Sequence, residues 1–182
     1  DRPGSRAVPY AAWLSEARDD PLSLTISADD IAIQAYTAGS TGRPKGCLLC
    51  HRGQLWFVGA AAGLLALTPE DRAVVAAPVG HKNATAAIKR LLYVGGSVVL
   101  MSGFQPEDYL EAIASHGVTC TTGVPAMYQM LLARPELFER YETRSVRFCF
   151  VGYAQVPSGT QELIRKYFPN ARIRETYGAT EA

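Results

Sequence analysis

The chain of 182 residues predicts an α/β protein with three layers, in which a mostly parallel sheet carries helices on both faces. Short apolar runs alternate with longer amphipathic stretches between Ala73 and Thr176, which is typical of strand–helix–strand units. Several of these runs are continuously apolar, as strands buried on both faces are. The length suits one hydrophobic core, so we expect one domain.

The first third of the chain predicts a different arrangement. Residues 1–30 form an approach segment with a short helix over Tyr10–Ala17. The apolar run Ile31–Tyr36 predicts a buried strand and Gly46–Cys50 a second strand, so the glycine-rich stretch between them joins two strands. A helix is expected over Gln54–Leu67, because Thr68-Pro69 would end it.

The remaining elements follow one another regularly. The expected strands are Ala73–Ala77, Ser97–Met101, Val118–Thr121, Arg147–Val151 and Ala171–Thr176. The expected helices are Ala84–Val94, a stretch from Pro106 to just before Gly117, Pro125–Leu132 with a further turn over Pro135–Tyr141, and Pro157–Phe168. Ligands of such sheets bind beyond the carboxyl ends of the strands, so the segments that follow the strands are the candidate site.

The amino-acid composition argues against several classes of function. Hydrophobic content of 48%, charged content of 19% and a net charge of +1 describe a globular protein with no electrostatic reason to bind nucleic acid or a membrane surface. The apolar run Leu55–Leu67 is too short to span a bilayer. No secretory signal follows Asp1, and the unpaired pattern of the cysteines fits the cytoplasm. A start at Asp1 and an end directly after a motif predict a piece of a longer protein.

The glycine-rich stretch is the most informative part of the chain, with the sequence Tyr36-Thr37-Ala38-Gly39-Ser40-Thr41-Gly42-Arg43-Pro44-Lys45-Gly46. Glycines let the backbone turn its N–H groups toward a ligand, and the hydroxyls and two cations add donors and positive charge. These features suit a polyphosphate. The common P-loop pattern cannot be fitted to these residues.

Three alternative interpretations apply to the glycine-rich stretch and to the cysteine run that follows it. A cluster of glycine, serine and proline can be a plain surface turn. Ala38-x-Ser40-x-Gly42 approximates the nucleophile elbow of a serine hydrolase, but Pro44 and Gly46 disfavour the helix that an elbow needs. The run from Cys47 to His51 matches the haem-attachment pattern C-x-x-C-H, yet it lies in an apolar strand with no export signal. Cys120 and Cys149 are expected to be small core residues.

Three further segments fall at carboxyl ends of expected strands. They are Tyr177-Gly178-Ala179-Thr180-Glu181, Phe150-Val151-Gly152-Tyr153-Ala154 and Ala77-Pro78-Val79-Gly80-His81-Lys82-Asn83-Ala84. Each is weak alone. Together with the glycine-rich stretch, and in this order, they resemble the signatures of the adenylate-forming superfamily, which includes acyl-CoA and aryl-CoA synthetases, luciferases and adenylation domains of peptide synthetases. Ala38 and Ser40 replace the usual Ser and Thr, and Tyr153 replaces a usually small residue.

The resemblance implies a role for each segment. Residues 31–182 would be an ATP/AMP-binding domain, with a C-terminal domain of the same chain beyond it. The implied phosphate-binding residues are Thr37, Ala38, Gly39, Ser40, Thr41, Gly42 and Lys45; those near adenine are Gly152, Tyr153, Ala154, Glu175, Tyr177 and Gly178. The implied acyl pocket comprises His81, Thr122, Gly152 and Gly178. Thr180, Glu181, His81 and Lys45 would act in catalysis, with Glu181 holding Mg²⁺.

By the same resemblance, the parent protein would use ATP, Mg²⁺ and coenzyme A to convert a small carboxylic acid into its thioester. Residues 79–85 contain no acidic side chain that could pair with a substrate ammonium, so we expect an acid without an α-amino group. A fatty acid is favoured, with an aryl acid or another adenylating reaction as the alternative. A nucleotide-binding module without activity is the rival from another class, and residues 1–182 alone are expected to be inactive. A homo-oligomer is possible.

Overall fold

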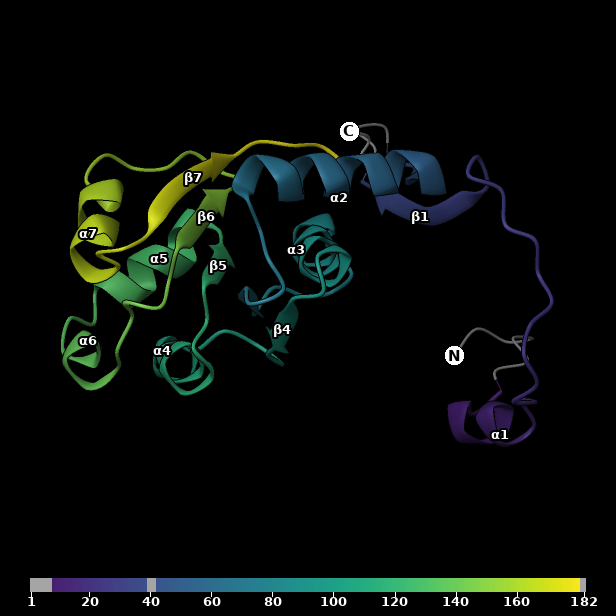
Figure 1. Cartoon of the computed structure of the whole chain (residues 1–182), viewed down its shortest axis with the longest axis horizontal. Coiled ribbons are helices and arrows are strands. Elements are labelled where there is room, and N and C mark those ends of the chain that lie inside the picture. Colours follow the sequence, from purple (N-terminus) through teal and green to yellow (C-terminus); the bar gives the residue numbers. More distant parts are fainter. Residues whose placement is uncertain (1–7, 39–41, 181–182) are drawn as a thin grey trace.

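The computed structural model describes residues 8–38 and 42–180. Its strands form two separate sheets (Figure 1). One is an antiparallel pair of β1 (Ile31–Thr37) and β2 (Lys45–Cys50). The other has five parallel strands in the order β4-β3-β5-β6-β7, namely β3 (Arg72–Val75), β4 (Ser97–Leu100), β5 (Cys120–Gly123), β6 (Phe148–Gly152) and β7 (Arg172–Thr176). The predicted parallel sheet is therefore confirmed.

Helices cover both faces of the parallel sheet, which makes the three predicted layers (Figure 1). One face packs on α4 (Pro106–His116), α5 (Pro125–Leu132), α6 (Leu137–Arg140) and α7 (Thr160–Tyr167). The other packs on α3 (Lys82–Tyr93) and the end of α2 (His51–Leu65). Successive strand side chains alternate between the two cores, since Ala73 and Val75 lie in the α3 core and Val74 lies in the other.

The order of the strands creates a topological switch point. The chain passes from β3 outward to β4, then returns across β3 to β5 and continues outward in the other direction. Crossovers between parallel strands are right-handed, so this reversal places α3 on one face and α4, α5 and α7 on the opposite face. The crevice between the carboxyl ends of β3 and β5 is where such sheets bind ligands.

The amino end of the sheet is held by a buried carboxylate. Asp71 is fully buried, and its two oxygens accept hydrogen bonds from Arg147 Nη1 at 2.8 and 2.9 Å. The hydroxyl of Thr119 and the main-chain N–H of Thr68 also donate to Asp71, at 2.7 and 2.9 Å. A buried charge is tolerated only when it is paired and hydrogen-bonded in this way. This network lies at the end of the strands opposite the switch point, so it is structural.

Several predictions of local structure need correction. The strand Ile31–Tyr36 is not buried, because among the described residues β1 pairs only with β2 and leaves Tyr36 66% exposed. The predicted helix over Tyr10–Ala17 is present as α1 (Tyr10–Ser15), which ends two residues earlier and buries no residue. Helix α2 begins at His51 rather than Gln54, and a left-handed Ala66 ends it before the predicted Thr68-Pro69 turn.

The predicted burial of Cys120 and Cys149 is confirmed. Among the described residues, no helix combines the length and apolar character needed to cross a membrane.

Candidate nucleotide and acid site

Two of the four motif segments touch, and the strand that follows the glycine-rich stretch reaches the same place. Lys82, the first residue of α3, donates through Nζ to the main-chain oxygen of Ala179 at 2.7 Å and lies 3.5 Å from that of Thr180. Cys47 of β2 donates through Sγ to the same Thr180 oxygen at 3.4 Å. The segment that follows β7 accordingly runs past α2 toward the β1–β2 pair (Figure 1). Residues up to 133 positions apart in the sequence are thus brought together.

The glycine-rich stretch connects β1 to β2. Thr37 and Lys45 pair across the two strands, so both ends of the loop are held side by side. Gly42 has φ +79°, a left-handed conformation that favours glycine. Gly39, Ser40 and Thr41 lie outside the described residues. The stretch leads into strand β2 at Lys45 and not into a helix, whereas the nucleophile elbow of a serine hydrolase passes directly into a helix.

The expected adenine-binding residues lie at the carboxyl ends of β6 and β7. Gly152 pairs with Thr176, and a Cβ atom at Gly152 would clash with the hydroxyl and carbonyl of Thr176. Tyr153 adopts φ +66° and its N–H lies 3.4 Å from the Thr176 oxygen. The side chain of Tyr153 is half exposed, and Ala154 is exposed. The ring of Tyr177 is fully exposed, so a planar group can reach it.

One expected adenine contact lies elsewhere. Glu175 accepts a hydrogen bond from Gln161 Nε2 of α7. Its strand register pairs it with Val151, whose side chain belongs to the core under α4, α5 and α7. Glu175 therefore belongs to the α7 face of the sheet, whereas Gly152 pairs with Thr176 beside the switch-point edge. Gly178 is exposed with open space around it, and Glu181 lies outside the described residues.

The residues expected at the acyl pocket flank the first turn of α3. His81 immediately precedes α3, is exposed and makes no capping hydrogen bond through its side chain. Thr122 of β5 is only 4% exposed, and its Oγ1 donates to Asn83 Oδ1 at 3.0 Å. Asn83, Ala87 and Arg90 are spaced four and three residues apart, so they share one face of α3.

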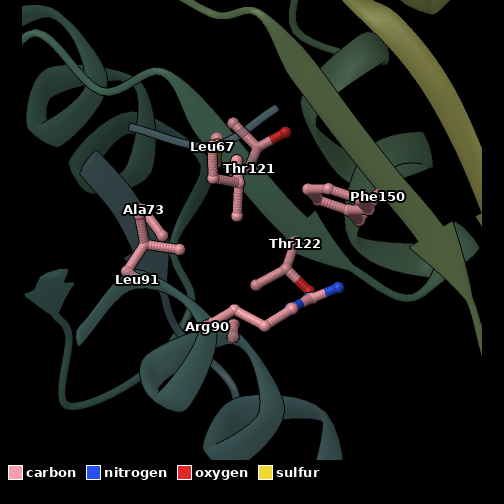
Figure 2. Close-up of a pocket in the computed structure, with 9 residues that line it drawn as sticks. Leu67, Ala73, Arg90, Leu91, Thr121, Thr122 and Phe150 are labelled. Atoms are coloured by element: carbon pink, nitrogen blue, oxygen red, sulfur yellow. The ribbon is translucent and has the colours of Figure 1, made fainter. Parts of the chain in front are cut away.

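Below that face lies a small cavity, shown in Figure 2. It is lined by Leu67, Ala73, Ala87, Arg90, Leu91, Cys120, Thr121, Thr122 and Phe150. Its volume of about 10 Å³ is at the lower limit for one water molecule. Arg90 extends from α3 to Thr122 and Phe150 at the side nearest the carboxyl ends of the strands.

Sequence reasoning missed three residues of this region. Lys82 stands within a predicted motif without a role of its own, but it holds the last motif through Ala179. Asn83 and Arg90 had no assigned role, although their helical spacing from Ala87 was a usable signal. Burial, together with the charge of Lys82, lowers the pKa of Lys89 on the same helix. Helix α3 carries three cationic side chains, Lys82, Lys89 and Arg90, and no acidic one, which suits an anionic ligand.

Comparison with known proteins identifies the family. The model of the family described as AMP-binding enzyme matches residues 4–182. The chain belongs to the AMP-binding enzyme family. It is 36% identical over 174 residues to a feruloyl-CoA synthase of Amycolatopsis sp, and 31% identical over 163 residues to 4-coumarate–CoA ligase 1 of Solanum tuberosum. The matches cover 94% and 86% of this chain but 35% and 30% of these relatives, so the chain spans about a third of their length.

Solved structures of the family share the fold. An O-succinylbenzoate coenzyme A synthetase from Bacillus subtilis, in complex with ATP and magnesium ion, has a TM-score of 0.77 at 27% identity. That comparison covers 93% of this chain and 35% of the other. The N-terminal domain of FACL13 from Mycobacterium tuberculosis has a TM-score of 0.82 at 23% identity, covering 94% of this chain and 42% of the other. The predicted class, a partial α/β domain of an adenylate-forming enzyme, is confirmed.

Proposed function

We propose that the full-length protein activates a carboxylic acid with ATP and transfers the acyl group to coenzyme A. The observation that carries this proposal is the meeting of the phosphate-loop strands, the start of α3 and the Tyr177–Thr180 segment beside the switch point. This arrangement brings hydroxyls, main-chain groups and cations together beside the carboxyl ends of the strands. Family membership and the names of the relatives support the same reaction.

The reaction proceeds in two steps. A carboxylate oxygen attacks the α-phosphorus of ATP, and the bond to the bridging oxygen breaks to release pyrophosphate. The thiolate of coenzyme A then attacks the acyl carbon and displaces AMP. Loop N–H groups and Lys45 stabilise the charge on the phosphates, and no nucleophilic side chain is required.

Magnesium enters this reaction with ATP as part of the substrate. The described residues contain no cluster of three or more His, Cys, Asp or Glu side chains that could hold a metal ion. Mg²⁺ commonly binds through one or two carboxylates plus substrate phosphates and water, so a single carboxylate at Glu181 is consistent with this coordination. Tyr177 would stack on adenine, and Thr180 would contact the α-phosphate.

For the acid, we propose an aryl or arylpropenoic acid without an α-amino group. The relatives named above are a feruloyl-CoA synthase and a 4-coumarate–CoA ligase, which favours the aryl alternative. The fatty-acid preference drawn from the sequence has no support among them and stays a prediction. A cytoplasmic location and a homo-oligomer likewise stay predictions.

The test is a screen of pyrophosphate release by the full-length protein with MgATP. The panel contains benzoic and cinnamic acids, fatty acids of several lengths and the standard α-amino acids, each with and without coenzyme A. We expect release with aryl acids and thioester formation only when coenzyme A is present. Nucleotide binding without pyrophosphate release from any acid would instead support a binding module. A preference for an amino acid would refute the proposed substrate class.

A further inference from the structure

Arg90 is a cation in an unusual position. It lies on the inner face of α3, partly buried between that helix and strands β5 and β6 (Figure 2). Its guanidinium carbon lies 4.9 Å from the centre of the Phe150 ring. Its Nε donates at 3.2 Å to the carbonyl oxygen of Ala86, one turn back on the same helix.

No carboxylate among residues 8–38 and 42–180 forms an ion pair with Arg90. A guanidinium has five N–H donors, and within the described part of the chain only Nε has a hydrogen-bond acceptor. Contact with the Phe150 ring offsets only part of the cost of removing a charge from water. Burial accordingly lowers the pKa of Arg90, but a guanidinium stays charged in proteins.

Arg90 lies between two parts of the contact between α3 and the sheet. On the side toward the amino ends of the strands lies the apolar cavity of about 10 Å³, too small for any acyl chain. Toward the carboxyl ends of β5 and β6 lie Thr122, which also borders the cavity, and the half-exposed Tyr153. The charge of Arg90 opposes the rise in the pKa of Tyr153 that burial causes. An acid that enters between α3 and the sheet therefore meets the guanidinium before it meets the cavity.

We propose that Arg90 closes the acyl pocket and selects acids with a second carboxylate at the end remote from the reacting one. This inference rests on the proposed function, because it takes the space between α3 and β5 as the acyl site. A carboxylate can accept two parallel hydrogen bonds from a guanidinium, a short and strong arrangement. An uncharged tail in the same place would cover the guanidinium and leave it without a partner, which is costly.

The test compares two acids of similar size, 4-carboxycinnamate and 4-methylcinnamate, as substrates of the full-length protein. The measured quantity is kcat/KM for pyrophosphate release. We expect the wild type to prefer 4-carboxycinnamate by on the order of tenfold or more, because a site with unpaired donors discriminates against a ligand that lacks the acceptor. This comparison of two substrates uses only the wild-type protein, so it stays informative if a variant fails to fold.

Variants then assign the preference to Arg90. Arg90→Leu should lose the preference mainly through a higher KM for 4-carboxycinnamate, and Arg90→Lys should retain part of it. The matched control is Arg165→Leu on the exposed surface of α7, across the sheet, which should keep the wild-type ratio. Equal rates for the two acids in the wild type, or an unchanged ratio in Arg90→Leu, would overturn the inference alone. Absence of pyrophosphate release with every acid of the screen would refute the proposed function, and the inference with it.

Discussion

The hydroxyl of Thr122 donates to Asn83 Oδ1 across 3.0 Å, and so joins the carboxyl end of β5 to the first turn of α3. The two residues are 39 positions apart and flank the switch point of the sheet. The main-chain oxygen of Thr122 also accepts a hydrogen bond from the buried hydroxyl of Tyr109, at 3.3 Å. Thr122 is therefore held from both faces of the sheet, which fixes the spacing between α3 and β5.

Thr122→Val should weaken acid binding while preserving the fold. Valine keeps the size of threonine but leaves Asn83 Oδ1 without this donor, so we expect a loss of about 1 kcal/mol in the free energy of unfolding. The KM for the acid should rise several-fold, as measured by pyrophosphate release in the full-length protein. Thr85→Val is the control, because its hydroxyl bonds only to carbonyl oxygens at the start of α3. Equal KM values for both variants would contradict the prediction.

Lys82→Met should impair nucleotide use. It removes the ammonium that donates to Ala179, which releases the Tyr177–Thr180 segment from α3. A hydrogen bond from a charged but partly exposed donor contributes about 1 kcal/mol, so the KM for MgATP should rise roughly five-fold. Unfolding midpoints should hardly change. Lys166→Met, an exposed lysine on α7, is the matched control and should leave the KM at its wild-type value.

Arg147→Met should destabilise the domain more than removal of an exposed arginine. Asp71 is fully buried, and loss of Arg147 leaves its charge with only Thr119 and Thr68 as donors. We expect a loss of about 3 kcal/mol in urea unfolding. Arg134→Met removes an arginine whose partner, Glu136, is itself half exposed, and should cost less than about 1 kcal/mol. Similar losses in the two variants would show that the Asp71 network is not a major stabilising contact.

The buried thiols should make the protein sensitive to alkaline pH. Burial raises the pKa of Cys120 to about 11 and that of Cys149 to about 12, from an ordinary value of 9.0. Below pH 9 both states keep these protons. Above pH 9 only the unfolded state loses them, so the free energy of unfolding falls as pH rises toward 11 and 12.

Urea unfolding at pH 8 and pH 10 measures this effect. Each thiol should contribute a loss on the order of 1 kcal/mol between the two values. The double variant Cys120→Ala, Cys149→Ala should show a correspondingly smaller difference between the two pH values, whatever its stability at pH 8. An equal difference in wild type and variant would assign the sensitivity to other groups.

Glu181→Gln should sharply reduce adenylation by the full-length protein without unfolding it. The amide keeps the size of the side chain but loses the anionic oxygen that Mg²⁺ prefers. This prediction rests on the family motif, since Glu181 lies outside the described residues. Pyrophosphate release measured over a range of Mg²⁺ concentrations checks it, and unchanged rates would show that Glu181 does not hold the metal.

The sequence alone determined the alternation of strands and helices, the parallel sheet and the family motifs. These features depend on local patterns: continuous apolar runs for buried parallel strands, proline and glycine at helix ends, and residues in a fixed order after a strand. The burial of Ile31–Tyr36 was wrong because an apolar strand is buried only if other elements cover it. Within the part of the chain that the structure describes, β1 pairs with β2 alone and stays largely exposed.

Only the tertiary structure decided which residues meet at the site. Lys82 and Ala179 are 97 positions apart, and Cys47 and Thr180 are 133 apart. The side chain of Arg90 reaches the ring of Phe150 from another element. No periodicity encodes such pairs, because they arise from the order of strands in the sheet and the face on which each helix packs. Local patterns therefore predict the elements, whereas contacts between side chains of distant elements depend on how those elements assemble.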